Sequence, residues 1–184
     1  RNLNETFYRR KEMENGNIRY GMSSDEFPDI FSKYDIIATS SIFSAQTRMH
    51  FEIATIAKKV SKENSKPILT VSGGVNARAL REHFLSNGFD IVALGEGEIT
   101  IVQIVEQFSS SKPDYSKVER IAFRKDDKTI ITSAPYRKPT KFIDHVPYAA
   151  IDIFPLEVYQ NLSNPSQSPH RPGTSFTGIQ TSRG

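Results

Sequence analysis

The sequence contains no cysteine among its 184 residues. A disulfide, a thiolate-bound metal and an iron–sulfur cluster held by thiolates are therefore impossible within these residues. Long apolar runs are also missing, because no stretch approaches the length needed to cross a membrane and no signal peptide is visible. We therefore expect a cytoplasmic protein without a membrane partner.

The chain also lacks a large excess of positive or negative charge. The formal net charge is only +3, and the lysines and arginines are scattered along the chain. Binding of nucleic acid usually needs a concentrated basic patch, so we expect an ordinary solvated surface and no nucleic-acid partner. His50 and His83 fall in predicted helices, and His145 and His170 fall in loops. No pair of them has metal-ligand spacing on one helix face, so we predict no metal-binding residues.

Short apolar strands alternate with helical segments in the middle of the chain. Strands are predicted over residues 35–40, 67–72 and 90–94. Helices are predicted near residues 45–63, 76–87 and 98–109. This alternation is typical of parallel βαβ units. We therefore expect an α/β fold of the Rossmann-like (flavodoxin-like) type, with helices flanking a parallel sheet.

The rest of the chain has a different character. Two β-rich runs around a charged turn predict an antiparallel hairpin over residues 120–133, outside the parallel sheet. A capping box, Ser23 with Glu26, predicts a short helix over residues 23–32. Residues 1–22 are expected to be irregular or weakly helical. We divide the chain into a domain over residues 1–112, a hairpin and extended linker over 113–174, and a final segment over 175–184.

Small and polar residues follow each of the three predicted strands. They are Ser40, Ser41 and Ser44 after the first strand, Gly73, Gly74 and Val75 after the second, and Gly95, Gly97 and Glu98 after the third. The carboxyl ends of parallel strands share one edge of a sheet, and ligands of such sheets bind beyond that edge. We therefore expect a ligand site there.

Each of these groups also has a structural explanation. The serines could cap the next helix, and the two glycines could form a tight turn with positive φ. Acidic residues before the third helix could cap it and complement its dipole. A paired-carboxylate acid/base site is the alternative for Glu96 and Glu98, but no nucleophile or metal ligand accompanies them. No single group identifies the ligand.

Taken together, the segments resemble a known family. Y-G-M-S-S-D-E-F, S-S-I-F-S-A-Q, V-S-G-G-V-N-A and D-I-V-A-L-G-E-G-E-I-T occur in that order. They are similar to the cobalamin-binding domain that precedes the barrel of radical S-adenosylmethionine enzymes, such as the anaerobic magnesium-protoporphyrin monomethyl ester cyclase and the cobalamin-dependent methylases. Further on, V-P-Y-A-A-I-D-I-F-P-L-E-V-Y resembles the family's linker, and G-I-Q-T-S-R-G resembles its first barrel strand. The resemblance covers most of residues 20–184.

The resemblance implies a cobalamin-binding fragment of a methyltransferase or an oxidative cyclase, with tetrapyrrole biosynthesis as one setting. It places Ser40, Ser41 and Ser44 near the nucleotide tail of cobalamin. Gly73, Gly74 and Val75 would line the same cleft, and Gly95, Gly97 and Glu98 would close its other side. It also implies a 4Fe–4S cluster and S-adenosylmethionine in the parent enzyme only. Because three thiolates hold that cluster, we expect no catalysis from this cysteine-free piece alone.

The sequence departs from the family at three points. It stops where the first cluster cysteine is expected, so we expect a piece of a longer protein with a truncated barrel. Two earlier strands of the family's domain are not found in residues 1–22. The Asp-x-His-x-x-Gly loop, which supplies a cobalt-ligating histidine in many cobalamin domains, is absent. Two other hypotheses stay open: a stand-alone flavodoxin-like nucleotide-binding or regulatory module, and a glycosyltransferase-like or other Rossmann enzyme.

Overall fold

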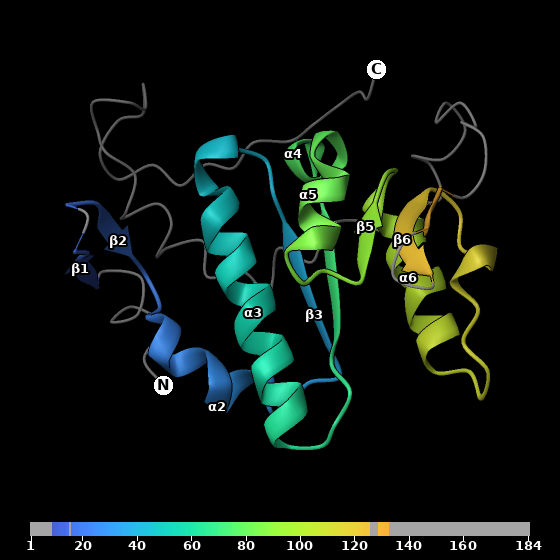
Figure 1. Cartoon of the computed structure of the whole chain (residues 1–184), viewed down its shortest axis with the longest axis horizontal. Helices are drawn as coiled ribbons and strands as arrows, with labels where there is room; N and C mark the ends of the chain where they lie inside the picture. Colours follow the sequence, from blue (N-terminus) through green and yellow to red (C-terminus); the bar gives the residue numbers. More distant parts are fainter. Residues whose placement is uncertain (1–8, 15, 126–128, 133–184) are drawn as a thin grey trace, which may run out of the picture. The chain divides into compact units, whose positions relative to one another are not determined.

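The computed structural model describes residues 9–14, 16–125 and 129–132, which belong to two compact units (Figure 1). In the first unit, β1 (Arg10–Glu12) and β2 (Ile18–Tyr20) form an antiparallel hairpin. The prediction of an irregular or weakly helical segment is therefore wrong at these residues. Gly16, at φ +77°, lies in the turn between the two strands, a conformation that glycine adopts without strain. The linker and final segment over residues 133–184 lie outside the described residues.

The second unit is built on a five-stranded sheet with the order β3-β4-β5-β6-β7. Its strands are β3 (Ile36–Ser40), β4 (Leu69–Gly73), β5 (Ile91–Ala93), β6 (Ile121–Lys125) and β7 (Thr129–Thr132). The first three are parallel, which confirms the predicted core. The last two pair as an antiparallel hairpin, as predicted.

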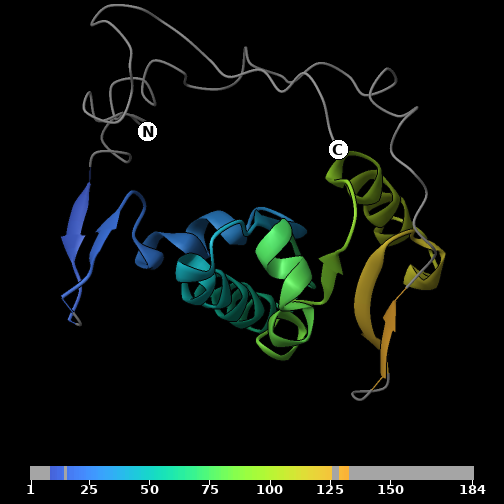
Figure 2. The same ribbon diagram turned by 90° about the horizontal axis from the view of Figure 1, so that it is seen from above.

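The expected position of this hairpin outside the core sheet is wrong. β6 pairs antiparallel with β5, and Ile91 lies opposite Phe123. Figure 2 shows β6 and β7 continuing the sheet beyond β5. The reason is the composition of β6: Ile121, Ala122 and Phe123 are consecutive and all buried. A strand that is apolar on both faces needs cover on both faces, and β6 obtains it by joining the edge of the parallel sheet, where Ala122 lies in one core cluster and Ile121 and Phe123 lie in the other.

Helices link the strands. They are η1 (Ser24–Glu26), α2 (Phe27–Phe31), η2 (Ser44–Gln46), α3 (Thr47–Glu63), α4 (Val75–Ala79), α5 (Arg81–Ser86), α6 (Gly97–Phe108) and η3 (Tyr115–Lys117). The predictions over residues 23–32, 45–63 and 98–109 are confirmed. The single helix predicted over 76–87 is wrong, because Leu80 leaves the helical region at φ −105°, ψ 29° and separates α4 from α5. No glycine or proline marks this break. Across the described residues, every helix is too short or too polar to span a lipid bilayer.

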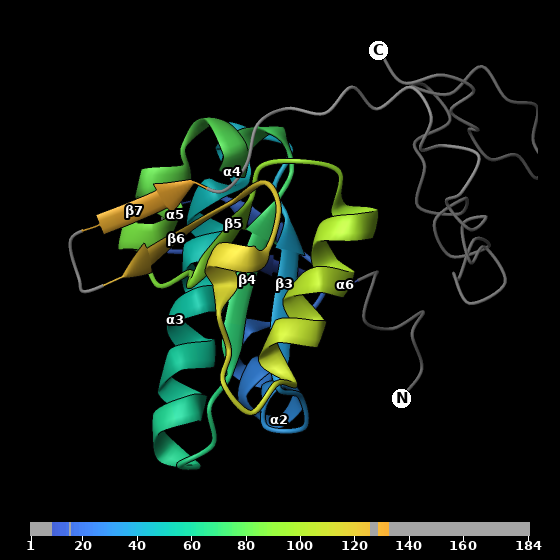
Figure 3. The same ribbon diagram turned by 90° about the vertical axis from the view of Figure 1, so that its right-hand side faces the viewer.

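The helices cover both faces of the sheet (Figure 3). On one face, α3, α4 and α5 bury a cluster that contains Ala54, Phe84 and Val92. On the other face, α6 buries a second cluster that contains Ile91 and Ile104. The neighbours Ile91 and Val92 thus point to opposite faces, as the strand period of two requires. Cover on both faces is the usual environment of parallel strands.

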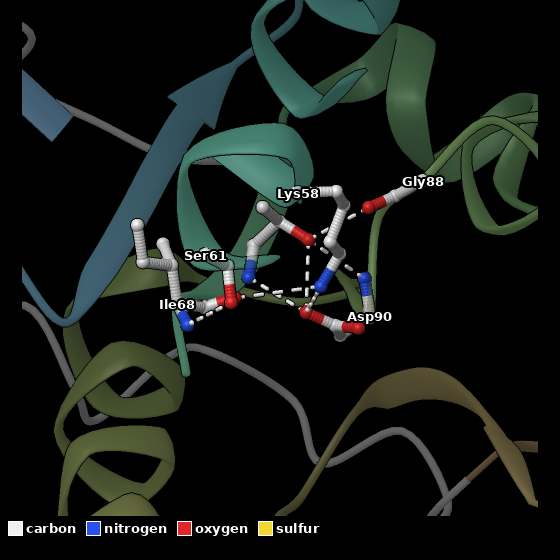
Figure 4. A network of polar contacts seen from close by, with 6 residues as sticks. Lys58, Ser61, Ile68, Gly88 and Asp90 are labelled. Carbon is white, nitrogen blue, oxygen red and sulfur yellow. Dashed lines mark hydrogen bonds and ion pairs between the residues drawn. The ribbon is translucent and has the colours of Figure 1, made fainter. Parts of the chain in front are cut away.

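A polar network ties α3 to the amino-terminal ends of β4 and β5 (Figure 4). Asp90 Oδ2 accepts a hydrogen bond from the Thr70 amide at 2.8 Å and forms an ion pair with Lys58 Nζ. The Thr70 hydroxyl donates to the Gly88 carbonyl at 2.8 Å and accepts from the Asp90 amide at 3.1 Å. These bonds satisfy the buried Thr70 and hold β4 and β5 in register at the edge opposite the predicted ligand site.

We expect Asp90→Ala to lower the free energy of unfolding by about 2 kcal/mol, because the buried Thr70 amide and the Lys58 ammonium both lose their acceptor. Urea denaturation measures this change. Asp35→Ala is the matched control, since the Asp35 carboxylate forms an exposed ion pair with Lys66 at 3.0 Å, which contributes little. Equal destabilisation by the two variants would contradict the assigned role of the network.

Candidate functional site

A cleft of about 640 Å³ lies at the carboxyl ends of the three parallel strands. Its lining includes the apolar side chains of Ala38, Val71, Ala93, Ile101 and Ile104. Val71 and Ile104 also belong to the core cluster beneath α6, which places the cleft on the α6 face of the sheet. Figure 3 shows α6 beside β3 and β4 on that face. The cleft therefore occupies the edge where the strand topology predicts a ligand.

The cleft brings together residues from all three predicted groups. Its lining contains Ser40, Gly73, Gly74, Val75, Gly95, Gly97 and Glu98. The other two predicted residues are not part of the lining: Ser41 is fully buried, and Ser44 is exposed at the start of η2. Contact between any of these residues and a ligand stays a prediction.

Ser41 connects the loops that follow β3 and β4. Its amide donates to the Gly73 carbonyl at 2.8 Å, and its own carbonyl accepts from the Asn76 amide at 3.1 Å. The Asn76 side-chain amide donates to Ser41 Oγ and to Thr47 Oγ1, each at 2.9 Å. The sequence patterns did not point to Asn76, although it is a polar residue only two positions after Gly73-Gly74. Ser41 and Asn76 therefore hold together the two loops that border the cleft.

The two adjacent glycines have different roles. Gly74 has φ +90° and ψ 165°, a conformation that is essentially restricted to glycine. A Cβ at Gly74 would lie 2.4 Å from the Ser41 carbonyl oxygen. A Cβ at Gly73 would meet only the Ala93 Cβ, at an ordinary 3.6 Å. Gly74 is therefore needed to close the backbone, whereas Gly73 leaves open space in the cleft.

Arg120 holds the loop between β5 and α6. Its side chain packs against Gly95, and a Cβ added at Gly95 would lie only 2.8 Å from Arg120 Nε. Arg120 has φ +60°, which costs an ordinary residue about 1 kcal/mol. The Leu94 amide donates to the Arg120 carbonyl at 2.7 Å and helps to hold this conformation. No sequence signal pointed to Arg120, because its position depends on the pairing of β6 with β5.

The charged groups of the cleft are few. Arg78 is the one basic residue of its described lining, and Glu96 and Glu98 are the acidic ones. Within the described part of the chain, no group of three or more histidine, cysteine, aspartate or glutamate residues could hold a metal ion. An apolar floor with small residues and hydroxyl groups around it is an arrangement that binds a ligand.

His50 lies on α3, outside this cleft. Its ring centroid is 6.1 Å from that of Phe84, and its buried Nδ1 has no hydrogen-bond partner among the described residues. Burial lowers the pKa of His50 below its ordinary value of 6.5. The folded state therefore disfavours the protonated ring. The contribution of neutral His50 to the free energy of unfolding is therefore fully present above pH 6.5. It is lost as the pH falls from 6.5 through the lower pKa of the folded state.

We expect the thermal midpoint of the wild-type protein to fall more steeply than that of His50→Leu between about pH 7.5 and about pH 5.5. Thermal unfolding followed by circular dichroism at several pH values measures the two slopes. His83→Leu serves as the control, because His83 is exposed on α5. Parallel slopes for the wild type and His50→Leu would show that His50 does not titrate in this way.

Among known proteins, the chain matches solved structures but no protein-family model and no curated protein sequence. The cobalamin-dependent S-adenosylmethionine radical enzyme OxsB, solved with aqua-cobalamin and S-adenosylmethionine bound, matches with a TM-score of 0.63 and 17% identity, over 76% of this chain and 19% of that chain. Apo, SeMet-labelled OxsB matches with a TM-score of 0.55 and 16% identity, over 72% of this chain and 18% of that chain.

A second radical enzyme also matches. The radical S-adenosylmethionine methyltransferase TsrM from Kitasatospora setae, solved with its tryptophan substrate and a SAM analogue, has a TM-score of 0.50 and 13% identity, over 62% of this chain and 22% of that chain. The present chain thus spans about a fifth of the length of each of these proteins. Identities this low show the fold alone, and they agree with the predicted Rossmann-like class. The chain shares the α/β fold of one part of these radical S-adenosylmethionine enzymes.

Proposed function

We propose that this chain is a cobalamin-binding module of a radical S-adenosylmethionine enzyme. The observation that carries the proposal is the cleft at the carboxyl ends of β3, β4 and β5, which gathers residues of all three family-like motifs. Ligands of open α/β sheets bind at this edge. The likeness of the fold to OxsB, which was solved with aqua-cobalamin bound, supports cobalamin as the ligand.

The residues present suit a large cofactor with a flat, apolar part. Gly73 has no side chain toward the cleft, and a Cβ at Gly97 would meet nothing within 4 Å, so a ligand can approach the backbone at both positions. Ala38, Ala93 and Ile101 offer apolar contacts. The Ser40 hydroxyl can hydrogen-bond a polar group of the ligand. When bound, cobalamin supplies a cobalt atom that can carry a methyl group, and the protein supplies position and environment.

The finer assignment is also part of the proposal. We propose that the parent enzyme is a methyltransferase or an oxidative cyclase with its own 4Fe–4S cluster and S-adenosylmethionine. The support is the resemblance of the segment over residues 175–184 to the first barrel strand of the family, and this segment lies outside the described residues. A tetrapyrrole substrate, a cytoplasmic location, the domain division and the lack of nucleic-acid and membrane partners stay predictions from the sequence.

Titration of the 184-residue chain with hydroxocobalamin tests the proposal. We expect saturable binding of one cobalamin per chain, measured by equilibrium dialysis and by the change in the corrin absorbance. Flavin mononucleotide is the comparison ligand, because a flavodoxin-like nucleotide-binding module would favour it. Saturable binding of flavin mononucleotide without binding of cobalamin would overturn the proposal in favour of that alternative.

A further inference from the structure

The turn at Gly74 determines where Arg78 lies. α4 begins directly after Gly74, and the Arg78 amide donates to the Gly74 carbonyl at 3.0 Å. Asn76 and Ala77 are buried on this short helix. Val75 and Arg78, three residues apart, share another face and both line the cleft. The backbone geometry that requires glycine therefore also brings a guanidinium group to the cleft.

Among the described residues, the charge of Arg78 has no partner. It is the only basic residue in the described lining, and its guanidinium makes no hydrogen bond or ion pair within the described part of the chain. Glu96 lies just before α6 and Glu98 lies in its first turn, so both come from a different part of the cleft, and each takes part in another interaction. An anionic group that entered beside α4 would therefore find a cation for which the described residues offer no competing partner.

We propose that Arg78 binds a phosphate ester of the ligand and so makes the cleft select corrinoids that carry the phosphodiester-linked nucleotide over corrinoids that lack it. This inference rests on the proposed cobalamin function. A guanidinium group carries a positive charge and presents a planar fork that matches two phosphate oxygens. The neighbouring Gly73 has no side chain and leaves room for a bulky phosphodiester to approach it.

The test uses the full chain and two corrinoids. Cyanocobalamin carries the phosphodiester, whereas dicyanocobinamide has the same corrin ring without the phosphodiester-linked nucleotide. We expect Arg78→Gln to weaken cyanocobalamin binding about tenfold and to leave dicyanocobinamide binding unchanged. Arg78→Lys should give an intermediate affinity for cyanocobalamin, since it keeps the charge but loses the fork. Arg81→Gln is the control, because Arg81 is exposed on α5 and outside the lining.

Added salt gives an independent readout. Wild-type affinity for cyanocobalamin should fall with increasing salt more steeply than that of Arg78→Gln, because screening weakens the charge–charge contact. Unchanged cyanocobalamin affinity in Arg78→Gln would overturn the role of Arg78 and leave the cobalamin proposal intact. Equal losses for both corrinoids would also overturn it, since the phosphate would then not be the group recognised. A wild-type chain that binds neither corrinoid would overturn the proposed function and this inference with it.

Discussion

Gly74→Ala should lower the free energy of unfolding by about 3 to 5 kcal/mol. Two penalties combine at this position. The backbone at φ +90° and ψ 165° is unfavourable for any residue with a side chain. The added Cβ would also lie 2.4 Å from the Ser41 carbonyl oxygen, which is main chain and already accepts the Asn76 amide. Relief of that contact would break the link between the loops after β3 and β4.

Urea denaturation of Gly74→Ala and Gly73→Ala measures the difference. Gly73→Ala is the matched control, because its Cβ would meet only the Ala93 Cβ at 3.6 Å, and it should change stability by no more than about 1 kcal/mol. Similar losses in the two variants would contradict the division of roles between the glycines. A stable Gly74→Ala would show that the loops can separate without cost to the sheet.

Gly73→Val should weaken cobalamin binding at least tenfold (about 1.4 kcal/mol) while the free energy of unfolding changes much less. Gly73 ends β4, where a β-branched residue suits the strand, and its backbone does not need positive φ. The added methyl groups would occupy the cleft at the point where glycine otherwise lets a ligand reach the backbone. The loss of cobalamin affinity should therefore exceed the loss of stability.

Cobalamin titration together with thermal midpoints separates the two effects. Gly73→Ala should give an affinity between those of the wild type and Gly73→Val, because it adds one carbon to the same space. Unchanged affinity in Gly73→Val would refute the placement of the ligand beside Gly73. A loss of binding that only follows unfolding would refute it as well.

Local patterns in the sequence were sufficient for the parallel core. The strands Ile36–Ser40, Leu69–Gly73 and Ile91–Ala93 were predicted within a few residues, because their apolar runs are short and the apolar stripes of α3 and α6 have helical spacing. The position of the cleft followed from the same alternation. Parallel strands joined by helices always bring their carboxyl ends to one edge, whatever the side chains are.

Only the tertiary structure decided what individual residues of that edge do. Ser41 and Ser40 are neighbours with equivalent chemistry, yet one is fully buried beneath the loops and the other lines the cleft. Gly73 and Gly74 are identical in sequence, and they differ because the Ser41 carbonyl lies 2.4 Å from a Cβ at one and not at the other. Such distances depend on backbone segments far apart in the chain, which no local pattern records.

The same reason explains the errors in the fold. A charged turn between two β-rich runs determines a hairpin locally, and β6 and β7 do form one. Its attachment to β5 depends on the pairing of Ile91 with Phe123 and on the burial of β6 on both faces. That pairing also places the Arg120 side chain across Gly95 at the cleft. The sequence by itself determined which segments are strands and helices, and long-range packing decided which strand edges meet and which side chains reach the ligand site.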